Sequence, residues 1–161
     1  MKHTAIIYSS KYGNTEQVGK SIGSLLKGQT AVTLIDLSQP VCLPLDGFDT
    51  FVLGTSIYAG HPRQQMVRFC QEHLPLLLRK TLFLYVCGMD RAHAIHEMTA
   101  AFPSELIMHA EEATFIDGEY QLGKMSLLER LLLRCCFKVK RPVYRHYPPL
   151  IRDFALHIGG Q

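Results

Sequence analysis

The chain has 161 residues, of which 47% are apolar and 19% are charged. This length suits one domain spanning residues 1–161, and the composition is typical of a soluble globular protein. No window approaches the roughly 18 to 20 apolar residues needed to cross a bilayer, and no signal-peptide pattern precedes the first apolar run. Five cysteines without metal or redox spacing indicate reduced thiols, so we expect a cytoplasmic protein.

The positive charge is concentrated late in the chain. Between Lys124 and His146 there are seven lysines and arginines and a single acid, Glu129. This segment carries a formal charge of +6, which leaves −3 for the remainder of a chain whose total is +3. A local basic segment favours a docking site over general affinity for nucleic acid, and we expect no nucleic-acid partner.

Apolar runs bounded by turn residues predict strands, and apolar residues spaced three and four apart predict helices. In chain order, the predicted strands cover residues 4–9, 31–37, 51–56, 81–87 and 113–116. The predicted helices cover residues 15–28, 62–78, 92–101, 104–111, 126–141 and 148–158. Because the strands are continuous apolar runs that alternate with helices, they predict an α/β protein with a parallel sheet covered on both faces.

Five such strands fit a three-layer, doubly wound sheet in the order 2-1-3-4-5. In that arrangement ligands bind at the carboxyl ends of the strands, where strands 1 and 3 are neighbours. The loops that follow strands 1 and 3 are also the unusual loops of this sequence. We therefore expect a ligand site at this edge of the sheet.

The first loop passes from an apolar strand through hydroxyl side chains and a glycine into a helix. Successive backbone N–H groups, short hydroxyls and a helix N-terminus suit a phosphate group. The loop lacks the Gly-Lys-Ser/Thr of a P-loop and the spaced glycines of a dinucleotide fingerprint. Taken alone, it is either an anion site or an ordinary turn with a helix cap.

A hydroxyl residue, two further positions and then Gly-x-Thr resemble the phosphate loop of flavodoxins. The resemblance implies a flavodoxin-like fold and FMN as the cofactor. It also implies that the loop wraps the FMN 5′-phosphate through Ser10, Lys11, Tyr12, Gly13, Asn14 and Thr15. Flavodoxins commonly have a second hydroxyl residue where this chain has Tyr12. Tyr12 would therefore contribute only its backbone N–H to the phosphate site, while Lys11 adds a positive charge.

The resemblance also assigns the two later loops to the flavin ring. The loop after strand 3 would flank the ring through Ser56, Ile57, Tyr58, Ala59 and Gly60. In it, Tyr58 or Ile57 offers a wall for the ring, and Gly60 allows a peptide to reorient toward the flavin N5. His61 either contacts the ring or caps the next helix. The loop after strand 4 would lie under the pyrimidine through Cys87, Gly88 and Met89.

Other chemistry is weakly indicated. Cys87 has no histidine or cationic partner in the pattern, which argues against a nucleophilic role. His93-x-x-His96 has helical spacing, but no further ligand completes a metal site. We name no general acid or base, because in such proteins the cofactor carries the redox chemistry.

The late basic segment begins with a capping box, Ser126-x-x-Glu129, which predicts the helix over residues 126–141. Arg130, Arg134, Lys138 and Arg141 share one side of that helix. The helix either packs on the sheet with a solvated basic face or uses Leu133 and Phe137 beside the arginines. The second arrangement would give peripheral contact with an anionic membrane or an acidic partner.

A narrower resemblance combines Gly54-x-Ser56-Ile57-x-x-Gly60-His61 with the late basic, leucine-rich segment. It is similar to the short flavodoxin-domain group that contains menaquinone-dependent protoporphyrinogen dehydrogenase. The resemblance implies an FMN-dependent oxidoreductase or electron carrier, with a redox partner protein or a small-molecule or quinone substrate. The alternative is a flavodoxin-fold module that binds proteins without a cofactor, and the unusual Lys11 and Tyr12 favour it.

Overall fold

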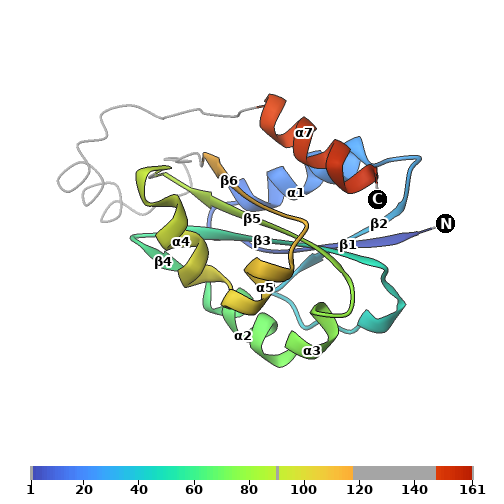
Figure 1. Ribbon diagram of the computed structural model, residues 1–161, viewed down its shortest axis with the longest axis horizontal. Helices are drawn as coiled ribbons and strands as arrows, with labels where there is room; N and C mark the ends of the chain where they lie inside the picture. The colour runs from blue at the N-terminus through green and yellow to red at the C-terminus, as the bar shows by residue number, and fades with distance from the viewer. Residues whose placement is uncertain (1, 90, 118–147, 161) are drawn as a thin grey trace.

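The computed structural model describes residues 2–89, 91–117 and 148–160 (Figure 1). Its strands are β1 (His3–Ser9), β2 (Ala31–Asp36), β3 (Thr50–Tyr58), β4 (His61–Pro62), β5 (Thr81–Gly88) and β6 (Glu112–Asp117). Its helices are α1 (Asn14–Leu25), α2 (Gln64–Glu72), α3 (Leu74–Leu77), α4 (Ala94–Ala101), α5 (Ser104–His109) and α7 (Pro148–Gly159), with 3-10 turns η1 (Leu45–Gly47) and η2 (Arg91–His93).

Five parallel strands form the sheet, in the order β2-β1-β3-β5-β6. This is the predicted doubly wound order, and the prediction is confirmed. In the register, Ser9 of β1 pairs with Thr55 of β3, and Ser56 of β3 pairs with Cys87 of β5. The carboxyl ends of these three central strands therefore lie side by side, which brings the three loops predicted to form the site to one edge.

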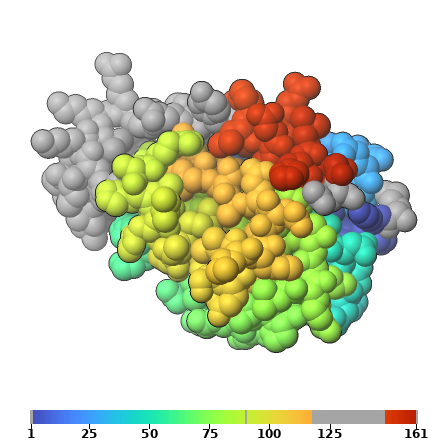
Figure 2. All heavy atoms as spheres, in the orientation of Figure 1, coloured from blue at the N-terminus to red at the C-terminus, as the bar shows by residue number. Residues whose placement is uncertain are grey.

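Helices cover both faces of the sheet, as the apolar strands predict. Figure 1 shows α1 and α7 on one face and α2 to α5 on the other. Alternate residues of β5 divide between the two cores: Leu84 packs toward α2 and α4, and Phe83 packs toward α7. In the space-filling view, β6 and α5 in orange lie between α7 in red and α4 in yellow-green (Figure 2). The central strands are thus buried on both faces.

A short hairpin after β3 extends the sheet beyond the predicted strand. The two-residue strand β4 pairs antiparallel with the end of β3, with Tyr58 opposite His61. The two residues of the turn, Ala59 and Gly60, both have positive φ, at 49° and 78°. Positive φ at both central positions is the geometry of a type I′ turn, whose twist matches that of the flanking strands.

The helix predicted over residues 62–78 is divided into α2 and α3. His73 lies between them with φ −112° and ψ 13°, outside helical geometry. Pro75 explains the break, because proline has no N–H to donate and its ring clashes with the carbonyl four residues earlier. Pro75 is tolerated in the first turn of α3, because the N–H that it lacks would have no partner within that helix.

The crossover from β2 to β3 contains no α-helix. Residues 37–49 make this connection with a single 3-10 turn, η1. A crossover between parallel strands is usually helical, and the helix then covers the sheet beside it. Here an irregular segment takes that position next to α2.

In the part of the chain that the structure describes, no helix is long and apolar enough to cross a membrane. The basic helix predicted over residues 126–141 lies outside the described residues.

Candidate functional site

The first loop is held in a compact turn between β1 and α1. The hydroxyl of Ser10 accepts a hydrogen bond from the backbone N–H of Gly13, with an N···O distance of 2.9 Å. Gly13 has φ 92°, a left-handed conformation that suits glycine and few other residues. The first helical residues, Asn14 and Thr15, are buried directly after this turn. The N–H groups of the first turn of α1 therefore lie at the carboxyl edge of the sheet.

A buried tyrosine supports this turn from beneath. The hydroxyl of Tyr85 in β5 donates a hydrogen bond to the carbonyl of Thr15, at 3.0 Å. A Cβ placed on Gly54 would lie 1.9 Å from the Tyr85 ring, and one on Gly19 would lie 3.1 Å from the hydroxyl. Burial raises the pKa of Tyr85 well above its usual value, so the hydroxyl stays a donor. Gly54 and Gly19 thus leave room for the Tyr85 side chain, and its hydrogen bond to Thr15 was not predicted from the sequence.

The loop after β3, which we call the third loop, contacts the first loop through aromatic side chains. The rings of Tyr12 and Tyr58 lie edge to face, with centroids 5.8 Å apart and an interplanar angle of 67°. The ammonium of Lys11 lies 3.5 Å from the Tyr58 ring centroid and 5.0 Å from that of Tyr12. We refer to these three residues as the Lys11–Tyr12–Tyr58 cluster. Cation–π and edge-to-face contacts join the two loops.

One cavity connects the three predicted loops. It is lined by Ser10, Lys11, Tyr12, Asn14, Ser56, Ile57, Tyr58, Cys87, Gly88 and Met89, all of which the sequence predicts as site residues. The four other predicted residues, Gly13, Thr15, Ala59 and Gly60, shape the turns beside it. The cavity volume is about 40 Å³, which is room for about one water molecule.

Several buried hydroxyls at this edge have no hydrogen-bond partner among the described residues. They are Thr15 Oγ1, Thr55 Oγ1 and Ser56 Oγ. Ser56 lines the cavity, and Thr15 and Thr55 lie beside it. A buried polar group without a partner costs about 1–3 kcal/mol, so such groups gathered near a cavity indicate a ligand. Hydroxyl donors beside a helix N-terminus fit a phosphate-bearing group. Thr55 was not predicted as a site residue, although a second hydroxyl next to Ser56 at the end of a strand is a readable signal.

The loop at the end of β5, which we call the fourth loop because β5 is the fourth predicted strand, is densely packed. Cys87 is buried, and burial raises the pKa of its thiol to about 12, so it stays a protonated thiol rather than a nucleophile at neutral pH. A Cβ on Gly88 would lie 2.3 Å from a carboxylate oxygen of Glu97 and 2.7 Å from the Phe115 ring. Glu97 is only 6% exposed. Sequence reasoning missed this buried carboxylate, because one acid within a short helix usually faces solvent.

An ion pair ties the end of β6 to the residue that begins η2. The guanidinium of Arg91 contacts the Asp117 carboxylate through Nε at 3.2 Å and Nη2 at 3.0 Å. The same guanidinium carbon lies 5.9 Å from the Phe115 ring centroid. A two-point pair of this kind fixes orientation as well as distance. It was not predicted, because residues 26 positions apart carry no local pattern.

The structure also places the three histidines that the sequence analysis singled out. The cap position of α2 is Arg63, so the prediction that His61 caps this helix is wrong; the β3–β4 hairpin places His61 opposite Tyr58 instead. His93 and His96 lie in η2 and α4, and within the described ranges no three histidine, cysteine or acidic side chains gather as a metal site.

Comparisons with solved structures show the same fold. Over 99% of this chain, rubredoxin oxygen:oxidoreductase from Desulfovibrio gigas gives a TM-score of 0.63 at 11% identity, and this chain spans 36% of that protein. A Streptococcus pneumonia TIGR4 flavodoxin gives 0.60 at 14% identity, covering 98% of both chains. A Fusobacterium nucleatum flavodoxin solved with flavin mononucleotide gives 0.56 at 14% identity, over 99% of this chain and 98% of that one.

No curated protein matches the chain. A family does match, over residues 5–142, and it is described as a flavodoxin domain. This match includes the strands, the three loops and the cavity between them. The chain belongs to the flavodoxin domain family.

Proposed function

We propose that this chain binds FMN between its first, third and fourth loops and passes electrons through the flavin. The observation that carries the proposal is the meeting of these loops around one cavity. The hydroxyl of Ser56, which lines the cavity, and that of Thr15, which lies beside it, are buried without partners among the described residues. The family match supports it, as does the Fusobacterium nucleatum flavodoxin that was solved with flavin mononucleotide.

The phosphate would be held by the loop between β1 and α1. Ser10 already bonds to the Gly13 N–H and keeps the turn in shape, while Thr15 offers a buried hydroxyl. The first turn of α1 adds N–H groups and the positive end of the helix dipole. Lys11 adds a full positive charge within the same loop. These groups together favour a dianionic phosphate over a neutral ligand.

The ring would be held where the Lys11–Tyr12–Tyr58 cluster now lies. The cavity has a volume of about 40 Å³, so these side chains must separate to admit a three-ring system. Tyr58 and Tyr12 are half-buried, and an aromatic face exposed by that opening suits stacking. When bound, FMN supplies one- and two-electron redox chemistry. The protein orients the ring, limits water at it and sets the charge around it.

The direct test is whether the purified full chain has a flavin absorption spectrum that survives desalting, or takes up added FMN. Riboflavin is the matched control ligand, because it has the same ring and lacks the phosphate. We expect FMN to bind at least tenfold more tightly than riboflavin, since a hydrogen bond to a charged group contributes about 1.5–3 kcal/mol. A colourless protein that takes up neither ligand would contradict the proposal and favour the cofactor-free protein-binding module.

The choice between electron carrier and dehydrogenase is a second step. The narrower proposal, a protoporphyrinogen-type dehydrogenase with a quinone acceptor, is supported by the Gly54-x-Ser56-Ile57 pattern and the basic segment. It predicts turnover of protoporphyrinogen by FMN-loaded protein in the presence of a quinone. A carrier would instead exchange electrons with a redox protein and give no such turnover.

We further propose that the basic segment contacts an anionic membrane or an acidic partner, on the evidence of its charge. The triple change Arg130→Glu, Arg134→Glu and Lys138→Glu should abolish binding to anionic lipid vesicles in a sedimentation assay. Neutral vesicles are the control. Vesicle binding that is unchanged in the folded triple variant, or absent in the wild type, would contradict a membrane role.

A further inference from the structure

A second concave site lies away from the cofactor cavity, between the β2–β3 crossover and helices α2 and α3. Its volume is about 570 Å³, and it shares no lining residue with the cofactor cavity. It exists because residues 37–49 form an irregular segment where a crossover helix would otherwise pack. A volume of roughly 300–1,000 Å³ is the range of small-molecule sites in proteins. We call this site the crossover groove.

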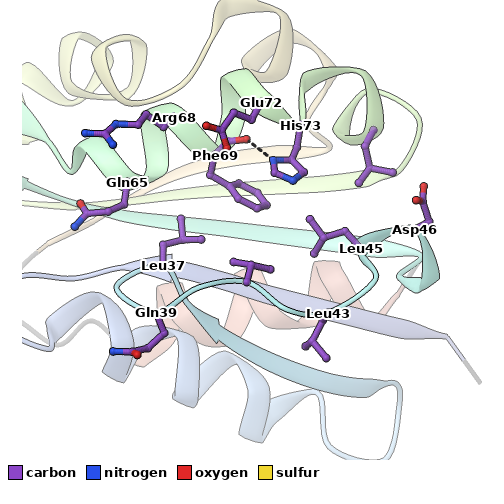
Figure 3. Close-up of a pocket in the computed structure, with 12 residues that line it drawn as sticks. Leu37, Gln39, Leu43, Leu45, Asp46, Gln65, Arg68, Phe69, Glu72 and His73 are labelled. Atoms are coloured by element: carbon purple, nitrogen blue, oxygen red, sulfur yellow. Dashed lines mark hydrogen bonds between the residues drawn. The ribbon is translucent and has the colours of Figure 1, made fainter.

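The middle of the crossover groove is apolar. Figure 3 shows Leu37 and Leu45 of the crossover segment facing Phe69 of α2 across it. The imidazole of His73 stacks on Phe69, with centroids 4.5 Å apart and an interplanar angle of 17°. Phe69 and Leu45 are themselves buried, at 5% and 8% exposed, so the apolar surface left open to a ligand is that of the less buried Leu37 and Leu43. Such a surface suits a flat, apolar body.

The polar groups of the groove are unevenly distributed. Figure 3 shows Gln65 and Arg68 of α2 and Gln39 of the crossover segment pointing toward one end. Asp46 lies at the other end, and Glu72 lies nearer His73. The first end therefore presents a guanidinium and two amides, whose N–H groups can donate to an anion. Arginine in particular matches the geometry of carboxylate and sulfonate oxygens.

His73 adds a polar contact beyond the apolar middle. Its Nδ1 lies 3.1 Å from the carbonyl oxygen of Phe69, which can only accept, so Nδ1 carries a hydrogen. In the neutral imidazole, Nε2 then has a lone pair and accepts. A ligand that extends along the groove would meet donors at the Arg68 end and an acceptor at the His73 side.

We propose that the crossover groove binds an organic anion with a flat apolar body, such as an aromatic carboxylic or sulfonic acid. The anionic group lies at the end formed by Arg68, Gln39 and Gln65, and the ring lies against the open apolar surface of Leu37 and Leu43. The proposal does not depend on FMN binding, because the two sites have separate linings. Both sites can be occupied at once.

The experiment uses the full chain, with and without added FMN, and two fluorescent probes that share the same ring system. The anionic probe is 8-anilino-1-naphthalenesulfonate, and the neutral probe is N-phenyl-1-naphthylamine, which lacks the sulfonate. Arg68→Gln removes the positive charge at one end of the groove. Arg79→Gln is the matched control, since Arg79 is an exposed arginine near the end of α3 that does not line the groove.

We expect Arg68→Gln to lower the affinity for the anionic probe about three- to tenfold, as for an exposed charged contact, and to leave the affinity for the neutral probe unchanged. Arg79→Gln should change neither probe. Leu43→Asp should weaken both, because it places a carboxylate on the apolar wall at a side chain that is already 47% exposed. Gln39→Glu, an exposed position, should weaken the anionic probe alone.

Three results would overturn the proposal. The first is equal affinity of the anionic probe for wild type, Arg68→Gln and Gln39→Glu, with unchanged melting temperatures. The second is displacement of the probe by FMN, which would place the probe in the cofactor cavity. The third is an equal loss in the Arg79→Gln control, which would indicate a general charge effect rather than a site.

Discussion

The two ends of the proposed cofactor site differ in how they are built. At the phosphate end, Thr15 is fully buried, and its carbonyl accepts a hydrogen bond from Tyr85 of β5, whose ring lies against Gly54 of β3. At the ring end, Lys11, Tyr12 and Tyr58 are half-buried and contact one another across a cavity of about 40 Å³. The phosphate end is therefore formed before a ligand arrives, while the ring end must rearrange. Preformed contacts avoid an ordering cost on binding that mobile ones incur.

The strongest way to break the phosphate end is to remove the space for Tyr85. Gly54→Ala would place a methyl group 1.9 Å from the Tyr85 ring, so the ring must move and the Thr15 bond is lost. We expect a loss of about 3 kcal/mol or more in the free energy of unfolding, at the upper end for an overpacked core. Chemical denaturation measures it.

Gly47→Ala is the matched control, because a Cβ there meets nothing within 4 Å. It should change stability by no more than about 0.5 kcal/mol. In a Tyr85→Leu background, the cost of Gly54→Ala should fall, since residues in contact are not additive. An equal cost in both backgrounds would show that Gly54 does not act by leaving space for the Tyr85 ring.

Thr15→Val separates ligand binding from folding. The change keeps the shape and removes a buried hydroxyl that has no partner in the described part of the chain. We expect FMN affinity to fall about tenfold while riboflavin affinity stays the same, because only FMN has the phosphate. The free energy of unfolding without ligand should stay the same or rise.

Isothermal titration with the two ligands measures this difference. Thr99→Val is the control for the substitution, since Thr99 is exposed on α4 and its hydroxyl bonds within its own helix. An equal loss for FMN and riboflavin in Thr15→Val would place the hydroxyl at the ring rather than at the phosphate.

The difference between the two ends also explains what could be read from the sequence. The strands, the helices and the parallel sheet followed from apolar runs and helical spacing, because these signals are local. The strand order came from the doubly wound fold that such strands fit, and the roles of the loops came from their resemblance to flavodoxins. Tyr85 and Glu97 could not be found in this way. Tyr85 lies against Gly54 and Glu97 lies against Gly88. Such neighbours are far apart in the sequence, so they become visible only when the three-dimensional structure is known. Pro75 was readable as a helix break and was overlooked.

Tyr85→Phe removes the hydrogen bond between Tyr85 and Thr15 without changing the packing of the ring. Loss of its bond to the Thr15 carbonyl should cost about 1 kcal/mol in the free energy of unfolding. The first turn of α1 should also exchange its amide hydrogens faster, because it is held by one contact fewer. Hydrogen exchange read by mass spectrometry would show this. Unchanged exchange over residues 14–17 would mean that the Ser10–Gly13 turn alone holds the loop.

Lys11→Met gives the smallest change in affinity and sharpens the description of the ring end. A cation–π contact at a partly exposed site contributes about 0.5–1 kcal/mol, so FMN affinity should change no more than about fivefold. The reduction potential of bound FMN should fall, because Lys11 lies 3.5 Å from the Tyr58 ring and a cation there stabilises the electron-rich reduced flavin. Lys11→Arg, which keeps the charge, should preserve the potential, and spectroelectrochemical titration compares the three proteins. Equal potentials in all three would mean that Lys11 leaves the ring when the cluster opens and acts on the phosphate instead.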